Sequence, residues 1–228
     1  MLADKKSGFL TELVRHHVSG QLKVAPEHVS PRALHYLGKP DAETYDRFVQ
    51  QYRQINQRLG LKQYLVPYFM SSHPGCTLED AIQLAVYMKR TDQHPDQVQD
   101  FYPTPGTLST AMFFTGLDPR DMTPVYVPRD PEEKAMQRAL MHYFKPYNRE
   151  LVLKALKKAG RQDLIGWGSD CLIPPYERRP KAEDHGKGKP SGRQGTDKKG
   201  SDRGRRPEAR RDRPPKHPVK GSTRRTKP

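Results

Sequence analysis

Short apolar segments alternate with amphipathic helices along the first half of this chain, and this alternation restricts the fold more than any other feature. Stretches typical of strands occur at residues 21–25, 63–68 and 97–102. A helical pattern fills each of the two gaps between them. The order strand–helix–strand–helix–strand predicts right-handed crossovers and therefore parallel strands. Three strands are too few to close a barrel, so we expect an open parallel sheet or part of a barrel.

Capping residues mark where the helices begin and end. Residues 30–38 predict a short helix, because Ser-Pro opens the segment and a glycine closes it. A longer amphipathic helix is expected between Asp41 and Gly60, with apolar residues three or four positions apart. Residues 77–80 resemble a capping box at the start of a third helix. Each of these helices lies between two predicted strands.

A helical region follows the third strand. Asp130 and Pro131 form an N-cap and a first helical position, and two acidic residues follow in the first turn. Matching apolar stripes at residues 135–143 and 151–159 are joined by a short link. This pattern predicts an αα-hairpin that packs on the α/β body.

The C-terminal segment, residues 177–228, has a different composition. It holds 19 of the 41 Lys and Arg residues but only 7 of the 26 Asp and Glu residues, a local charge of +12. Every aromatic residue lies before it. Such a segment buries too little apolar surface to offset the entropy of ordering, so we expect a disordered basic tail. We therefore divide the chain into residues 1–116, 117–176 and 177–228.

Composition also excludes several classes of protein. No apolar run approaches the roughly 18 residues of a membrane helix, and the first residues do not form a secretion signal. The two cysteines, Cys76 and Cys171, are far apart and form no CxxC pair, which excludes a disulfide scaffold, a zinc finger and a complete iron–sulfur ligand set. We expect a cytoplasmic protein with reduced thiols.

Candidate site residues lie on the loops that follow the strands, because parallel α/β proteins carry their reactive groups at the carboxyl ends of strands. This rule selects residues 26–28, 71–75 and 100–106. Local turn and capping roles are the simpler interpretation of each single residue. A triad of Ser72, His73 and Asp100 is disfavoured, because adjacent residues rarely have the geometry of nucleophile and base.

Three long segments carry a resemblance to a known family. Residues 18–28, 64–75 and 97–110 closely resemble the YgiQ family of radical SAM proteins. Residues 126–129, 134–138 and 157–166 resemble that family's uncharacterised C-terminal domain. The resemblance covers roughly residues 7 to 174. Pro-Gly turns that begin at Pro74 and Pro105 are similar to those after the fifth and sixth barrel strands of tRNA methylthiotransferases. The resemblance therefore implies the fourth to sixth strands of a partial barrel.

The resemblance also implies cofactors. Members of this family hold a [4Fe–4S] cluster and S-adenosylmethionine through a CxxxCxxC loop after the first barrel strand. This chain begins after that region, and we expect it to bind no metal by itself. By barrel position, the side chains expected to offer hydrogen bonds to polar groups of S-adenosylmethionine are those of Glu27, Ser71, Ser72, Asp100 and Thr104. Tyr102 is expected to stack on the ligand or to shape the pocket.

Two functions follow from these observations. The first is the C-terminal portion of a radical SAM enzyme of unknown substrate, inactive alone, as either a truncated product or one piece of a split protein whose partner is an N-terminal radical SAM half. The second is a non-catalytic module that binds nucleic acid through residues 177–228, since nineteen Lys and Arg residues attract phosphate. That segment has no aromatic residue for base stacking, and it can equally be a solvated extension. Removing residues 177–228 discriminates between these functions.

Overall fold

A computed structural model describes residues 6–176, which lie within one compact unit, Met1–Arg179. The expected basic tail, residues 177–228, lies outside the described residues. The elements in chain order are α1 (Phe9–His16), β1 (Gln21–Glu27), α2 (Pro31–Leu37), α3 (Ala42–Leu59), β2 (Tyr64–Ser71), α4 (Leu78–Arg90), β3 (Gln99–Asp100), α5 (Leu108–Thr115), α6 (Pro131–Met141), η1 (Pro146–Asn148), α7 (Arg149–Lys158) and η2 (Gln162–Leu164).

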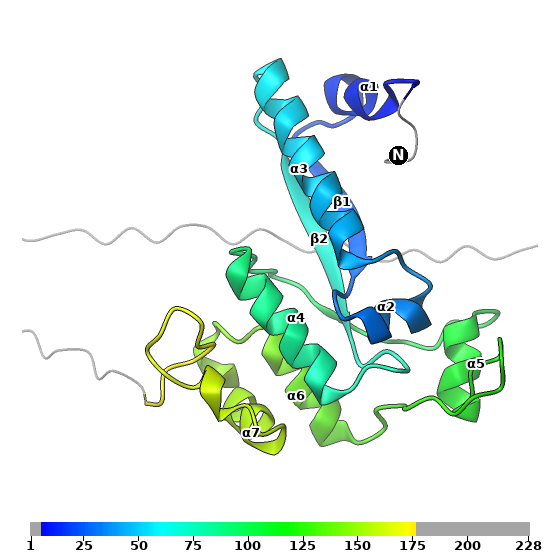
Figure 1. Ribbon diagram of the computed structural model, residues 1–228, viewed down its shortest axis with the longest axis vertical. Helices are drawn as coiled ribbons and strands as arrows, with labels where there is room; N and C mark the ends of the chain where they lie inside the picture. The colour runs from blue at the N-terminus through cyan, green and yellow to red at the C-terminus, as the bar shows by residue number, and fades with distance from the viewer. Residues whose placement is uncertain (1–5, 177–228) are drawn as a thin grey trace, which may run out of the picture. The chain divides into compact units, whose positions relative to one another are not determined.

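The three strands form one parallel sheet in the order β1-β2-β3, as the alternation of strands and helices predicts. Gln21 of β1 is in register with Tyr64 of β2, and Ser71 at the end of β2 is in register with Asp100 of β3. Helices α2 and α3 lie in the first crossover and α4 lies in the second (Figure 1). The chain is therefore an α/β protein whose strands all end at the same edge.

The strands differ in length from the expected segments. β1 does not stop at Pro26 but continues to Glu27, and β2 runs to Ser71 through Pro67. Proline lacks the N–H of a ladder hydrogen bond, so a strand tolerates it where one side has no neighbour. Pro26 meets this condition because β1 is an edge strand, and Pro67 does because β3 pairs with only the last two residues of β2.

The predicted helix boundaries are confirmed at the capping residues. Asp41 caps α3 by accepting a hydrogen bond from the backbone N–H of Thr44, and Gly60 ends that helix in a left-handed conformation. Thr77 and Asp80 form a reciprocal capping box at the start of α4. Asp130 accepts a hydrogen bond from the second residue of α6. Helix α5 was not predicted, because its apolar residues form no stripe on one face.

The largest hydrophobic core lies between α4, α6 and α7, which Figure 1 shows packed together. Its fully buried members include Ile82 of α4, Leu140 of α6 and Leu156 of α7. A smaller cluster centred on Phe69 connects β2 with α4 and the end of α6. The helical hairpin is thus built into the body of the described unit. Among residues 6–176, no helix combines the length and the apolar character needed to cross a membrane.

Candidate functional site

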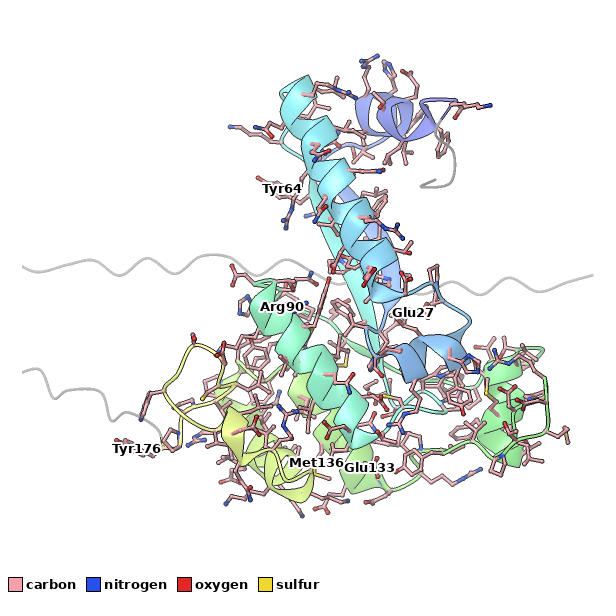
Figure 2. All side chains as sticks on the ribbon, viewed as in Figure 1. Glu27, Tyr64, Arg90, Glu133, Met136 and Tyr176 are labelled. Atoms are coloured by element: carbon pink, nitrogen blue, oxygen red, sulfur yellow. The ribbon has the colours of Figure 1, made fainter. Side chains whose placement is uncertain are left out.

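The loops after the three strands come together at the carboxyl edge of the sheet. Glu27, the last residue of β1, is in register with Phe69 of β2, and Ser71 is in register with Asp100. Figure 2 labels Glu27 at the end of β1 and Glu133 on α6. The parallel order therefore places the predicted candidate loops side by side, although it does not place every candidate side chain at the edge.

Glu27 ends β1 in a left-handed backbone conformation, with φ at 63°. A residue with a Cβ rarely adopts this conformation, and it occurs here beside a register shift in the β1–β2 pairing. The carboxylate forms an ion pair with Lys39, with Oε1 3.3 Å from Nζ, and the side chain keeps 23% of its surface exposed. Glu27 is therefore an accessible carboxylate at the edge of the sheet.

Ser71 and Asp100 bind each other. The Ser71 hydroxyl donates to Asp100 Oδ1 at 2.5 Å. Arg138 of α6 also donates from Nε to Asp100 Oδ1 at 2.9 Å and forms an ion pair with the same carboxylate. Two candidates from different strands are thus brought together, but their polar groups are occupied by protein partners.

Ser72 is buried, with 2% of its surface exposed, and its backbone adopts a left-handed conformation with φ at 61°. Its backbone N–H donates to Gln137 Oε1 at 3.0 Å. Its hydroxyl has no hydrogen-bond partner, which is costly for a buried polar group. Among the predicted residues, Ser72 therefore has a buried side-chain hydroxyl without a protein partner. Strained backbone of this kind is concentrated at functional sites.

The structure does not bring Tyr102 and Thr104 into contact with the other candidates. Tyr102 is 82% exposed. Thr104 is also exposed, and its carbonyl accepts hydrogen bonds from the hydroxyls of Thr107 and Thr110 at the start of α5. Thr104 therefore contributes to the turn that leads into α5.

A buried polar cluster lies beneath the edge. His28 Nε2 is 3.5 Å from Cys76 Sγ, and the two residues are 2% and 0% exposed. Burial lowers the pKa of His28 to about 4, although the nearby Asp80 carboxylate opposes this shift. Burial also raises the pKa of the Cys76 thiol. Both groups are therefore neutral at pH 7, and they do not form a thiolate–imidazolium pair.

Asp80 is the buried charge in this region. Its carboxylate accepts hydrogen bonds from Ser30 Oγ at 2.5 Å, from Thr77 N at 2.8 Å and from Arg32 Nη2 at 2.6 Å. Burial by itself would raise the pKa of Asp80, but these hydrogen bonds outweigh burial and lower the pKa below its ordinary value. Asp80 thus connects the start of α2 to the start of α4 and is a structural residue.

His73 is not paired with Ser72. Its Nε2 is 2.7 Å from the hydroxyl of Ser109, and its Nδ1 is 2.7 Å from the carbonyl of Pro74. Its ring also packs edge-on against Phe101. The disfavoured triad of Ser72, His73 and Asp100 is therefore not assembled.

The sequence patterns did not identify two residues that bind the carboxyl edge. Gln137 has no exposed surface and binds the loop after β2, and Arg138 binds Asp100. A signal was present for Gln137, because Glu133, Gln137 and Leu140 share one face of α6, and polar side chains on a buried helical face need partners. No comparable signal marks Arg138, whose side chain is 55% exposed.

No group of three or more His, Cys, Asp or Glu residues within 6–176 is arranged to hold a metal ion. Cys76 is buried against His28, whereas the Cys171 sulfur donates to the carbonyl of Asp163 at 3.5 Å. The two cysteines are thus in different surroundings.

Two cavities flank the sheet. One of about 620 Å³ lies beside the amino-terminal half of β2 and is lined by residues of α3 and of the segment 91–97. An apolar groove of about 390 Å³ lies between β1 and the helices α2 and α3, and Val24, Leu34 and Phe48 are among the residues that line it. The groove reaches the carboxyl end of β1, because Pro26 and His28 also line it.

The fold and the site define the class of protein: the chain is a parallel α/β unit, and a C-terminal helical segment binds the polar carboxyl edge of its sheet. The family model described as "Domain of unknown function (DUF3362)" matches residues 96–227. The chain belongs to this family, and its curated relatives carry the name UPF0313 protein.

The sequence relatives are much longer than this chain. A UPF0313 protein of Clostridium perfringens (strain 13 / Type A) is 58% identical over 193 residues, which are 85% of this chain and 29% of the relative. A UPF0313 protein of Clostridium botulinum (strain 657 / Type Ba4) is 54% identical over 174 residues, which are 76% of this chain and 27% of the relative. The chain thus spans less than a third of either relative. No solved structure matches it significantly.

Proposed function

We propose that this chain forms the later barrel strands and the C-terminal segment of a radical SAM enzyme. One observation carries the proposal: three consecutive strands run parallel in the order β1-β2-β3, with helical crossovers, and end in one row of polar loops. In parallel α/β enzymes, ligands bind at this edge. The motif resemblance supplies the class of chemistry, and the substrate is unassigned.

The carboxyl edge has groups that suit S-adenosylmethionine, which carries an amino group, a carboxylate and ribose hydroxyls. Glu27 offers an accessible carboxylate that can accept hydrogen bonds from hydroxyl or ammonium groups. The buried hydroxyl of Ser72 has no protein partner and can donate or accept. We therefore assign these two residues to the ligand and assign Ser71 and Asp100 to support of the edge.

The described residues do not fit the [4Fe–4S] cluster. A [4Fe–4S] cluster is held by three or four cysteine thiolates, but this chain has two cysteines. Cys76 is buried with a raised thiol pKa, and Cys171 is in different surroundings. No step through a cluster is therefore assigned to residues 6–176. In the proposed enzyme, the cluster loop belongs to a part that corresponds to the unmatched length of the relatives.

The unpaired edge of β1 supports association with the part that carries the cluster loop. β1 is an edge strand of the described sheet and borders an apolar groove. Unpaired strand edges and exposed apolar surface favour pairing with another segment. We propose that the preceding barrel strand covers β1.

The test combines this chain with the unmatched portion of the C. perfringens relative, expressed separately. After anaerobic treatment with iron and sulfide, we expect the mixture to retain iron and to bind radiolabelled S-adenosylmethionine in equilibrium dialysis. The chain alone should do neither. The melting temperature of the chain should rise in the mixture, because a partner that binds only the folded state stabilises it.

Variants connect this test to the site. Glu27→Ala and Ser72→Ala should each weaken S-adenosylmethionine binding by the mixture about tenfold, the effect of losing one charge-assisted or buried hydrogen bond. Glu43→Ala, at an exposed position in the first turn of α3, is the matched control and should have no effect. A mixture that neither binds S-adenosylmethionine nor raises the melting temperature would refute the proposed function.

A further inference from the structure

Two neighbouring residues of α6 reach the ends of two strands. The Gln137 amide binds the loop after β2: its Oε1 accepts from Ser72 N at 3.0 Å, and its Nε2 donates to the Cys76 carbonyl at 3.2 Å. Arg138 binds Asp100 at the end of β3. One helix thus holds the carboxyl ends of both strands.

The orientation of the Gln137 amide is set by Glu133, one turn earlier in α6. Gln137 Nε2 also donates to Glu133 Oε1 at 3.2 Å, and the other oxygen of Glu133 accepts from the Tyr126 hydroxyl at 2.6 Å. Because the carboxylate requires a donor, the amide nitrogen faces Glu133 and Cys76, and the amide oxygen is left to face Ser72. The Tyr126 carbonyl accepts from Gly75 N at 2.6 Å, which adds a further bond to the same loop.

The held loop has a conformation that needs support. Ser72 has a φ of 61°, and a non-glycine residue keeps such a conformation only where its surroundings determine it strongly. The hydrogen bond from Ser72 N to Gln137 fixes the peptide that precedes its Cα. The same residue carries the buried hydroxyl without a partner. Gln137 therefore controls where that hydroxyl lies.

We propose that Gln137 and Arg138 are positioning residues of the site, so that α6 forms one of its functional parts. Gln137 holds the Ser72 hydroxyl toward a ligand at the carboxyl edge, and Arg138 holds the Asp100–Ser71 pair that supports this edge. Both residues lie in the segment matched as a domain of unknown function, which also contains β3. The role of α6 in holding the loop is inferred from these contacts alone. The identity of the ligand, S-adenosylmethionine, rests on the proposed function.

Hydrogen exchange of the full chain tests the holding role. Gln137→Met keeps the size of the side chain but removes both hydrogen-bonding groups, and it should raise amide exchange across residues 71–77 about tenfold. Exchange in α7 should not change. Gln83→Met, an exposed glutamine on α4, is the matched control. Unchanged exchange at residues 71–77, or an equal increase in every segment, would overturn the holding role.

Arg138→Met provides a second test if Gln137→Met does not fold. The Arg138 side chain is 55% exposed, so its replacement should not prevent folding. Arg138→Met should raise exchange at residues 99–102, and Arg138→Lys should restore part of the protection by keeping the charge. Equal exchange in all three proteins would overturn the role of Arg138.

Affinity for S-adenosylhomocysteine, measured calorimetrically on the mixture described above, tests the role toward the ligand. Gln137→Met should weaken this affinity about tenfold, and Gln83→Met should leave it unchanged. Faster exchange at residues 71–77 together with unchanged affinity would overturn the role of Gln137 in positioning the Ser72 hydroxyl toward the ligand. If the unsubstituted mixture does not bind this probe, the proposed function fails, whereas the exchange experiment still decides whether α6 holds the loop.

Discussion

Gly75 lies against the ring of Tyr36 so closely that a Cβ on Gly75 would overlap the ring. Gly75 also has a φ of 85°, a left-handed conformation that residues with a Cβ rarely adopt. This contact joins the loop after β2 to α2, and it lies one residue before the buried Cys76. Glycine is therefore required here for two separate reasons.

Gly75→Ala should lower the free energy of unfolding by about 3 kcal/mol or more, because steric overlap adds to the backbone cost. Gly106→Ala is the control, since Gly106 has a φ of 80° but open space around its Cβ position. That variant should lose about 1 kcal/mol. Urea unfolding followed by circular dichroism gives both values. Equal losses would show that the Tyr36 contact has no energetic weight.

Acidification should destabilise the fold through two histidines. Burial lowers the pKa of His28 and of His73 to about 4, from an ordinary value of 6.5. Between these values the unfolded chain binds more protons than the folded chain, so the free energy of unfolding falls as the pH falls. From pH 7 to pH 5, each histidine should contribute a loss of roughly 2 kcal/mol.

Urea unfolding at several pH values measures this effect. His28→Gln should flatten the dependence on pH, whereas His17→Gln, at an exposed position, should not. A wild-type stability that stays constant from pH 7 to pH 5 would contradict the buried neutral state of both rings.

Asp80 should be far more important for stability than its neighbour Glu79. Asp80 is 2% exposed and binds the starts of both α2 and α4, so Asp80→Ala should cost about 3 kcal/mol through the lost cap and the lost charged hydrogen bonds. Glu79 forms a half-exposed ion pair with Arg161, so Glu79→Ala should cost at most about 1 kcal/mol. Chemical unfolding of the two variants compares them, and similar losses would refute the assignment.

The two thiols should react at very different rates. Cys76 has no exposed surface, and burial raises its thiol pKa, whereas Cys171 is partly exposed. Because the thiolate is the nucleophile, Ellman's reagent should label one thiol rapidly in the native chain and both thiols in urea. Cys171→Ser should abolish the rapid phase. Two rapid thiols in the native chain would be incompatible with a closed loop after β2.

Several elements could be predicted from local sequence because local physics determines them. The capping box at Thr77 and Asp80 and the N-caps at Asp41 and Asp130 are formed by neighbouring residues, so the same residues mark the helices in the sequence and in the structure. The alternation of strand and helix likewise determined a parallel sheet, since a crossover helix reverses the direction of the chain between strands. The parallel order then places Glu27, Ser71 and Asp100 at one edge.

Only the tertiary structure decided which candidates are available. Ser71 is bound to Asp100, Asp100 is also bound by Arg138, which is far away in sequence, and Tyr102 is exposed. The roles of Gln137 and of the His28–Cys76 pair depend on side chains from distant segments meeting in a buried space. The sequence by itself determined the capped starts of α3, α4 and α6 and the parallel order of the strands, because neighbouring residues set them. Packing between distant segments determined which polar groups have protein partners and which do not.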